Sequence, residues 1–225
     1  MALEANKTIV ETQTWLKQLG YNPGIVDGVW GKNSETAYNA LLNNNVRNDG
    51  EIEATPWGVK FTDQEIAKLR QVVKNLGLPV RNVPDFMACM AWETGETFSP
   101  SVKNPGSSAT GLIQFMDATA IGMGTTTAAL AKMSVVEQLG YVEKHFMPYR
   151  KKIQNLGDIY MSILLPKMVG LPDSAVLWKQ GDGPFIPNKG LDINQDGVIT
   201  RLEAVHKVRN KMVKGFLPGN VRRAA

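Results

Sequence analysis

The sequence predicts a mainly α-helical protein built of two units, and three observations support this prediction. Apolar residues recur at helical spacing in most segments, for example between residues 9 and 19. Two capping boxes, Thr62 with Glu65 and Ser134 with Glu137, are typical of helix N-termini. Alternation of apolar and polar residues, which would indicate half-buried strands, is scarce.

Length and composition set outer limits on the fold and the function. The chain has 225 residues, of which 43% are hydrophobic and 20% are charged, as expected for one mid-sized domain plus a small one. Its net charge of +4 fits an anionic partner such as a cell wall, a membrane surface or nucleic acid, without selecting among them. The single cysteine, Cys89, excludes an intramolecular disulfide, and no apolar run is long enough for a transmembrane helix.

The first unit is expected to span residues 1–45. Its first helix ends at Gly20, two turn signals follow, and Asn33 or Ser34 can cap a second helix. The next segment, residues 46–61, is rich in Asn, Gly and charged residues near its start, and is interpreted as a linker.

The second unit, residues 62–225, is predicted to be larger and mostly helical. Its helix from Pro84 to Glu93 is apolar on almost every side, so we expect this helix to be buried. The other helices of this unit are expected to begin near Asp63, Ser134, Asp158 and Thr200.

Glu93 is the candidate catalytic residue because it ends the apolar helix. Desolvation there disfavours the charged form of a carboxyl and raises its pKa. A carboxyl that stays protonated near neutral pH can protonate the leaving oxygen of a glycosidic bond. The alternative is a helix-terminal carboxylate held in a salt bridge. Further along, the amide of Gln114 follows a polar loop and a Gly-led turn, where it can orient a sugar or bond to the backbone.

Two motifs around these residues point to a family. Glu93-Thr94, followed by Gly111-Leu112-Ile113-Gln114-Phe115-Met116, resembles the soluble lytic transglycosylase and goose-type lysozyme superfamily over residues 85–170. The resemblance implies a lysozyme-like helical domain in which Glu93 is the general acid and later the base, and Gln114 lines the sugar subsites. Thr94 stands where the family usually has Ser. Tyr160 is a further substrate-binding candidate, since an aromatic ring can stack on a sugar.

The sequence departs from this family at two places. The family motif Ala-Tyr-Asn-x-Gly is absent, and residues 164–170 look more like phage endolysins of the group. No Asp or Glu lies between Thr97 and Gln114, where goose-type lysozymes place helper carboxylates. A lytic transglycosylase needs only one carboxylate, because the C6 hydroxyl of the substrate attacks and leaves a 1,6-anhydro sugar. This activity is therefore favoured. Glu96, three residues after Glu93, keeps a hydrolytic muramidase open, and a non-catalytic wall-binding or virion structural protein is the third alternative.

The first unit carries a second resemblance. The stretch from Gln13 to Gly31, with Leu19-Gly20-Tyr21 and Val26-Asp27-Gly28, is similar to the peptidoglycan-binding domain of the three-helix type. Asp27-Gly28 forms a tight turn that lets two helices close on the loop. Together the two resemblances imply a phage endolysin that cleaves the β-1,4 bond between N-acetylmuramic acid and N-acetylglucosamine.

Residues 192–203 match the EF-hand calcium loop at its diagnostic positions. Gly197 supplies the sharp turn, and the segment before the loop is too rich in Gly and Pro for a normal entering helix. The ion is expected to fasten the C-terminal helix, and the alternative is a polar turn before a helix capped near Thr200. The expected calcium ligands are oxygen atoms of Asp192, Asn194, Asp196, Val198, Thr200 and Glu203.

These interpretations set expectations for partners and location. Bacterial peptidoglycan is the expected partner, and calcium is the expected cofactor, with a structural role and none in the chemistry. We expect no nucleic-acid partner, no stable membrane insertion and a monomer. Residues 1–8 lack the pattern of a secretory signal. The resemblance to phage endolysins therefore implies synthesis in the bacterial host cytoplasm and action on the wall after the membrane is opened.

Overall fold

The computed structural model describes residues 6–224, and these residues form a mainly helical protein, as predicted. Four very short strands form two antiparallel pairs, β1 (Ala54–Thr55) with β4 (Arg222–Arg223) and β2 (Val176–Lys179) with β3 (Val198–Thr200). The α-helices are α1 (Lys7–Gln18), α2 (Lys32–Asn43), α3 (Asp63–Asn75), α4 (Val83–Glu93), α5 (Asp117–Gly122), α6 (Thr127–Leu130), α7 (Val135–Phe146), α8 (Leu156–Leu164), α9 (Phe185–Asn188) and α10 (Arg201–Gly215).

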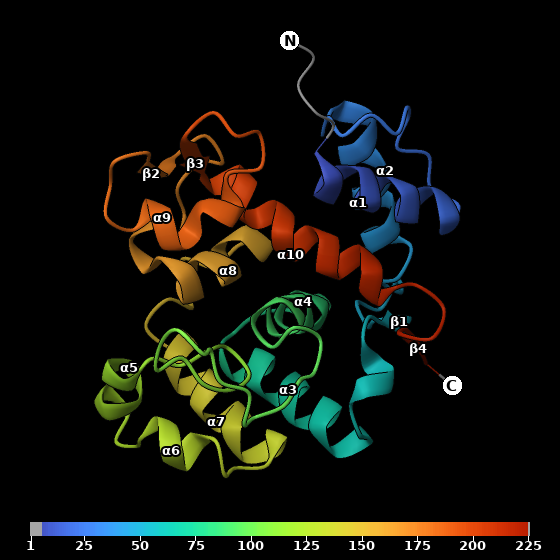
Figure 1. Cartoon of the computed structure of the whole chain (residues 1–225). Helices are drawn as coiled ribbons and strands as arrows, with labels where there is room; N and C mark the ends of the chain where they lie inside the picture. The colour runs from blue at the N-terminus through green and yellow to red at the C-terminus, as the bar shows by residue number, and fades with distance from the viewer. Residues whose placement is uncertain (1–5, 225) are drawn as a thin grey trace.

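Helix α10 is the central element of the structure. It crosses the molecule between the N-terminal helices and the larger helical part, and it packs against α1, α4 and α8 (Figure 1). Val205, Val208 and Met212 of α10 are almost completely buried. At its end a Cβ on Gly215 would lie 2.6 Å from the Trp57 ring, so the close approach of this ring requires glycine. The last helix of the chain is therefore part of the core.

The N-terminal unit contains two α-helices within residues 6–45, α1 and α2, where the resemblance implies three. Neither Asn33 nor Ser34 caps α2, because the helix begins at Lys32, before both of them, and Gly31 occupies its N-cap position. The Ser34 hydroxyl instead accepts a hydrogen bond at 3.0 Å from the side chain of Gln13. The cap was predicted wrongly because this tertiary contact uses the residue that resembled a cap.

Gln13 also organises the loop between α1 and α2. Its side-chain oxygen accepts hydrogen bonds from the backbone amides of Asp27 and Gly28, at 3.1 and 3.0 Å. Its amide nitrogen donates to the Val29 carbonyl at 3.0 Å. Since Gln13 is almost fully buried, one side chain fixes the loop on which the wall-binding resemblance depends.

Residues 46–61 connect the two units as a packed segment. Trp57 is only 1% exposed, and its indole N–H donates to the Lys211 carbonyl of α10 at 2.9 Å. Strand β1, just before it, pairs with β4 near the C-terminal end of the chain. Buried side chains of this segment join one continuous hydrophobic core that extends into both units.

The longer helices of the second unit follow the predicted starts closely, whereas the short helices α5, α6 and α9 were not predicted. Both capping boxes, Thr62 with Glu65 and Ser134 with Glu137, are formed in full. Helix α8 begins at Leu156, slightly before the predicted start, because Asn155 caps it.

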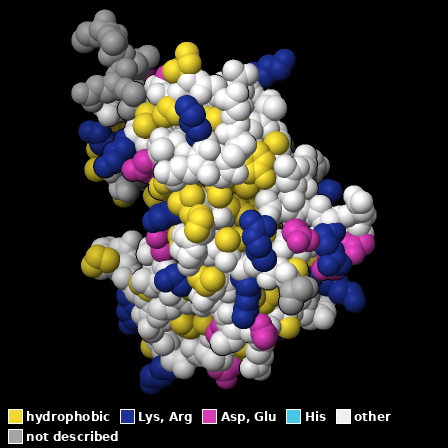
Figure 2. All heavy atoms as spheres, turned by 90° about the vertical axis from the view of Figure 1, so that its right-hand side faces the viewer, with side chains coloured by type: hydrophobic (Ala, Val, Ile, Leu, Met, Phe, Trp, Pro, Cys, Tyr) yellow, Lys and Arg dark blue, Asp and Glu magenta, His cyan; other side chains and the backbone are white. Residues whose placement is uncertain are grey.

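The surface shows no strongly charged face in the view of Figure 2. Lysine and arginine side chains are scattered among acidic ones. Hydrophobic side chains gather in the middle of this face, where the N-terminal unit meets the larger part (Figure 2). Among the described helices, none is long and apolar enough to cross a membrane.

Candidate active site

Glu93 is the last residue of α4, and that helix is the most deeply buried element around the site. Every residue from Val83 to Ala91 is buried. The Glu93 side chain keeps a small opening to solvent but is otherwise surrounded by protein, and this burial raises its pKa to about 8. No cation among residues 6–224 forms an ion pair with Glu93. The structure therefore does not support the salt-bridge alternative for this carboxyl.

Thr94 shapes the turn that follows Glu93. Its hydroxyl donates to the Met90 carbonyl at 2.7 Å and accepts from the Phe98 amide at 3.0 Å. The side chain is only 2% exposed. Because both hydrogen-bonding functions are in use inside the protein, Thr94 holds the backbone behind Glu93.

The turn after Thr94 has an unusual backbone. Gly95, Glu96 and Phe98 all have positive φ, at 59°, 69° and 53°. Only glycine adopts this left-handed conformation without strain, so the surrounding contacts must hold Glu96 and Phe98 in place. Phe98 is held by its ring, which packs edge-on against Phe61 at 4.9 Å between centroids.

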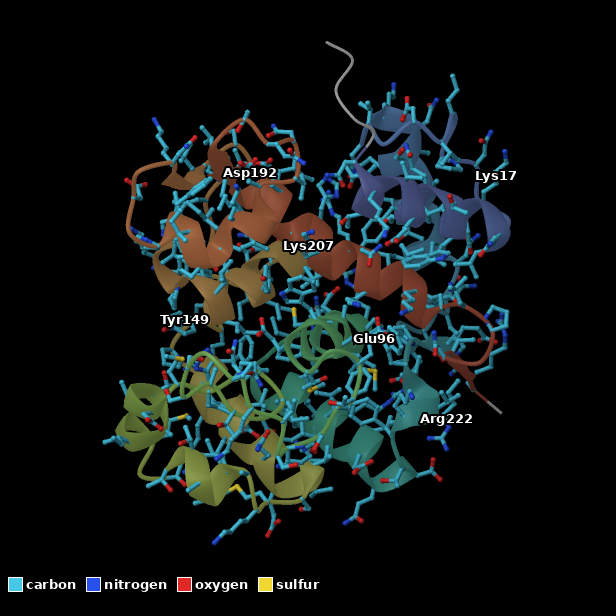
Figure 3. The ribbon with its side chains drawn as sticks, in the orientation of Figure 1. Lys17, Glu96, Tyr149, Asp192, Lys207 and Arg222 are labelled. Carbon is cyan, nitrogen blue, oxygen red and sulfur yellow. The ribbon has the colours of Figure 1, made fainter. Side chains whose placement is uncertain are left out.

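Glu96 is held by ion pairs to α10. Its carboxylate lies 2.7 Å from the Lys214 ammonium and is also paired with Lys211. Figure 3 shows Glu96 beside α4, under the C-terminal half of α10. Partial burial raises the pKa of Glu96, but the hydrogen bonds and charges of the two lysines outweigh that effect and lower it below the usual range. Glu96 is therefore an ionised structural partner of α10.

Tyr160 and Cys89 lie behind Glu93 in the core. Tyr160, on α8, is 1% exposed; burial and the nearby charge of Glu93 raise the pKa of its hydroxyl well above the usual value. Its ring is thus near the candidate acid but closed to a stacking sugar. Cys89 is buried on α4, and burial together with the Asp85 and Glu93 charges raises the pKa of the thiol. A thiol in this state is a poor nucleophile.

Gln114 lies in a tight turn between Thr110 and Phe115, whose backbone groups hydrogen-bond to each other in both directions at 2.9 and 3.0 Å. Its own φ is +53°. The side-chain nitrogen donates to the Gly111 carbonyl at 3.0 Å and more weakly to the Val102 carbonyl at 3.4 Å. The amide nitrogen of Gln114 therefore supports the turn.

Gln138 is the residue of this region that the sequence did not indicate. It is fully buried on α7, and its side-chain oxygen accepts from the Leu112 amide at 2.6 Å. Its nitrogen donates to the Pro100 carbonyl at 3.0 Å and the Leu130 carbonyl at 2.9 Å. One side chain thereby joins three segments around the Gly111 turn. Nothing in a lone glutamine on an amphipathic helix predicts such a role.

Gly111 is required by this arrangement. Its φ is +84°, and a Cβ there would lie 2.4 Å from the Gln138 side-chain oxygen. Both the conformation and the close approach exclude other residues.

The predicted calcium loop adopts a tight polar turn. One Asp192 oxygen accepts from the Gly197 amide at 3.0 Å, while the other is buried without a hydrogen-bond partner. Asn194 and Asp196 each accept a hydrogen bond from the backbone amide two residues later, at 2.9 and 2.8 Å. Gly197 has φ +82°, as its place in the motif requires.

Glu203 points to the start of α10. One carboxylate oxygen accepts from the Thr200 amide and hydroxyl at 2.9 and 2.7 Å, which completes a capping box. Val198 and Thr200 lie in β3, and only the short α9 and a 3-10 turn precede the loop, in agreement with the absence of a normal entering helix. Within residues 6–224, no three His, Cys, Asp or Glu side chains are gathered to hold a metal ion.

No protein-family model matches the chain, and no curated protein gives a significant match to it.

Proposed function

We propose that this protein is a peptidoglycan lytic transglycosylase of the endolysin type, with Glu93 as its catalytic acid and base. The bond cleaved is the β-1,4 bond between N-acetylmuramic acid and N-acetylglucosamine. The observation that carries the proposal is the Glu93 carboxyl itself. It ends a buried helix, has no ion-pair partner among the described residues, and has a pKa raised to about 8. Such a group holds its proton at neutral pH, as a general acid must.

The reaction needs one carboxyl. Protonated Glu93 donates its proton to the glycosidic oxygen as the bond between that oxygen and C1 of muramic acid breaks. The Glu93 carboxylate then takes the proton of the C6 hydroxyl, whose oxygen forms the new bond to C1. The products are a shortened strand and a 1,6-anhydro-muramic acid end. Glu93 recovers its proton, and no water is consumed.

The ion pairs of Glu96 favour this activity over hydrolysis. A hydrolase of the usual kind needs a second carboxylate that positions water or attacks the sugar. Glu96 is next along the chain, but Lys211 and Lys214 already engage its carboxylate. We assign Glu96 and Thr94 to the turn that positions Glu93, and Tyr160 to the apolar wall behind it. Gln114 remains the candidate for substrate contact through its side-chain oxygen.

We also propose that the N-terminal unit binds the wall. Ile25 and Val29 are 80% and 66% exposed on the loop that Gln13 holds. These two exposed apolar side chains are available for a contact with the wall. A wall-binding loop on the same rigid core as Glu93 would keep the enzyme on its polymer between cuts. Synthesis in the bacterial host cytoplasm, action on the wall after membrane opening and a monomeric state belong to the same proposal.

The calcium site is proposed on one observation beyond the motif. The buried Asp192 oxygen without a partner is an acceptor that a cation would satisfy. Asp192, Asn194, Asp196, the Val198 carbonyl, Thr200 and Glu203 would hold the ion. These are the oxygen ligands that calcium prefers, and Glu203 would exchange part of its capping role for coordination. Bound calcium would supply charge and rigidity to the start of α10 and no chemistry to the reaction.

Mass spectrometry of purified peptidoglycan digested with the full chain tests the proposal. Fragments that end in 1,6-anhydro-muramic acid, one water lighter than hydrolysed fragments, are the expected products. Ordinary reducing ends on muramic acid would establish a hydrolytic muramidase instead. An undigested wall that retains bound protein would favour a non-catalytic wall-binding protein.

A further inference from the structure

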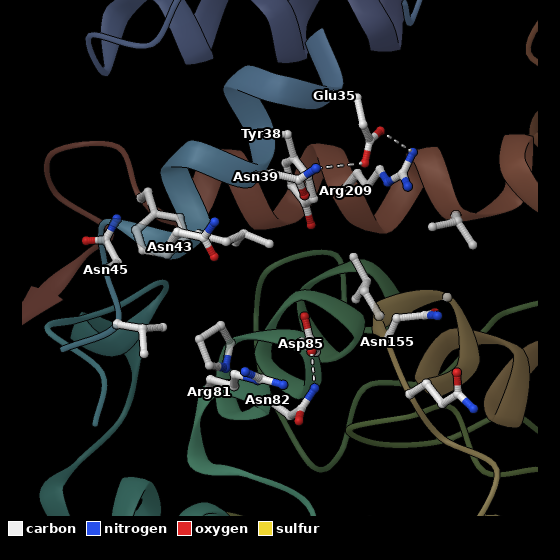
Figure 4. Close-up of a pocket in the computed structure, with 18 of the residues that line it drawn as sticks. Glu35, Tyr38, Asn39, Asn43, Asn45, Arg81, Asn82, Asp85, Asn155 and Arg209 are labelled. Carbon is white, nitrogen blue, oxygen red and sulfur yellow. Dashed lines mark hydrogen bonds and ion pairs between the residues drawn. The ribbon is translucent and has the colours of Figure 1, made fainter. Parts of the chain in front are cut away.

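A polar cavity of about 370 Å³ lies where the N-terminal unit meets the larger part of the molecule. Its walls come from α2, from the N-terminal ends of α4 and α8, and from α10 (Figure 4). Neither Glu93 nor Gln114 lines it, so this cavity is distinct from the candidate active site.

Several buried hydrogen-bond donors that lack acceptors line the cavity. Within residues 6–224, four buried side-chain polar atoms have no hydrogen-bond partner, and one of them is the Asp192 oxygen of the predicted calcium loop. The other three are the Tyr38 hydroxyl, Arg201 Nε and Arg209 Nη1, and all three residues line this cavity. Each of these atoms can donate a hydrogen bond. Buried polar atoms are rarely left unpaired, so three donors beside one cavity indicate a missing acceptor.

Arg209 is the cation best placed for a ligand. Its side chain is 13% exposed; the nearest Glu35 oxygen is 3.5 Å from Nη1, without a hydrogen bond, and the nearest Asp173 oxygen is 4.0 Å from Nη2. Arg201 differs, because Asp158 at 2.9 Å and Asp173 already pair with it. Arg209 thus forms long ion pairs with Glu35 and Asp173, but its Nη1 makes no hydrogen bond and can still donate one to a ligand.

The wall opposite Tyr38 carries the carboxyl of Asp85. Figure 4 shows Tyr38 pointing into the cavity from α2 and Asp85 pointing toward it from α4. Asp85 is only 8% exposed and accepts one hydrogen bond, from the Asn82 side chain at 2.7 Å. Burial raises the pKa of Asp85 to about 7. This carboxyl can accept from a ligand N–H, or donate when it is protonated.

We propose that this cavity binds a short peptide with a free carboxylate, of the kind carried by the stems of peptidoglycan. Arginine and tyrosine donors on one wall suit carboxylate oxygens, and guanidinium groups are preferred partners of carboxylates. Asp85 on the other wall suits a peptide N–H. The volume of about 370 Å³ falls within the usual range for small-molecule sites. That the peptide comes from the bacterial cell wall rests on the proposed function. That the cavity binds a carboxylate rests on its own residues and is independent of that function.

Isothermal titration calorimetry of the full-length Glu93→Gln chain tests this site without turnover. The probes are a soluble disaccharide-tetrapeptide from digested peptidoglycan, the same disaccharide without its peptide, and free glutamate. The disaccharide-tetrapeptide is expected to bind more tightly than either of the others. Adding Tyr38→Phe or Arg209→Lys should weaken this binding by about fivefold or more, because each removes a donor to the carboxylate. Adding Tyr141→Phe, a matched change on α7, should leave binding unchanged.

Three outcomes would overturn the proposal. Equal binding of the peptide-free disaccharide, whose only carboxylate is the lactyl group of muramic acid, would show that no peptide is recognised. Glutamate binding as tightly as the disaccharide-tetrapeptide would assign the site to a free small carboxylate instead of the wall. Unchanged binding in both cavity variants, with unfolding temperatures that show intact protein, would place the peptide elsewhere. Wall digestion by the wild-type chain is read separately, so failure of the enzyme and failure of this site are distinguishable.

Discussion

The Lys214 ammonium of α10 lies 2.7 Å from a carboxylate oxygen of Glu96, three residues after the candidate catalytic acid. This pair connects the central helix to the left-handed turn behind Glu93. The Lys214 ammonium also engages the Glu96 carboxylate, which is the second carboxylate that a hydrolytic mechanism would need.

Replacing Glu96 with Gln should therefore leave the chemistry intact. The digestion rate is expected to stay within about threefold of wild type, with anhydro ends unchanged, because the group positions a turn and touches no substrate. Unfolding free energy should fall by about 1 kcal/mol or less, as for a partly exposed ion pair. Rates and product masses measured side by side check this. A loss of activity as large as that of the Glu93 variant would make Glu96 a second catalytic carboxylate.

Replacing Glu93 with Gln should remove activity. Gln cannot donate the proton, so the rate of wall digestion is expected to fall at least about 100-fold. Turbidity loss of purified walls measures the rate. Glu143→Gln on α7 is the matched control and should digest walls normally. Undiminished digestion by folded Glu93→Gln protein would place the active site elsewhere.

The activity and stability of the wild-type chain should both fall as pH rises toward 8. Burial raises the pKa of Glu93 from 4.5 to about 8, so the folded state binds this proton more tightly than the unfolded state. The contribution of Glu93 to the free energy of unfolding is therefore fully present below pH 4.5, and it is lost as pH rises through 8. Asp85, raised from 3.8 to about 7, acts in the same direction.

Thermal unfolding at several pH values separates the two carboxyls. Glu93→Gln should reduce the loss of stability between pH 5 and 8. Asp85→Asn should reduce only the part of that loss that occurs below about pH 7. The digestion rate of wild type should decline with an apparent pKa near 8, since the acid must be protonated. An identical pH dependence of stability in wild type and Glu93→Gln would contradict the raised pKa.

Gly111→Ala should be strongly destabilising. The new Cβ would lie 2.4 Å from the Gln138 oxygen at a φ of +84°, so unfolding free energy should fall by about 2–4 kcal/mol. Gly122→Ala is the control, because a Cβ there meets nothing within 4 Å. That change should be neutral or slightly stabilising in chemical denaturation. Equal effects at both positions would mean that Gln138 does not hold this turn.

Calcium should raise the unfolding temperature of the wild-type chain. At a concentration about 100 times the dissociation constant, the ion would add about 2.7 kcal/mol to stability. Asp192→Asn should reduce this gain, because it removes charge from the oxygen pair that faces the loop. Scanning calorimetry with calcium, with magnesium and with a chelator makes the comparison. Identical unfolding temperatures in calcium and chelator would exclude a structural ion.

The sequence alone was sufficient for the longer helices of the second unit, but it did not indicate the short helices α5, α6 and α9. Thr62 with Glu65 and Ser134 with Glu137 predicted two helix starts correctly, because capping depends on residues only three apart. Burial of α4 was also predicted, because a helix that is apolar on all sides has no face for water. Glu93 followed from this pattern, since its raised pKa depends mainly on that burial.

Tertiary structure decided what the other side chains of the site do. Glu96 and Gln138 received their roles from partners on α10 and in distant turns, and no local pattern encodes such pairs. The same holds for the cavity between the units, whose donors come from helices far apart in sequence. Local spacing determines helices and burial, whereas the partner of a polar side chain is set only when separate segments pack together.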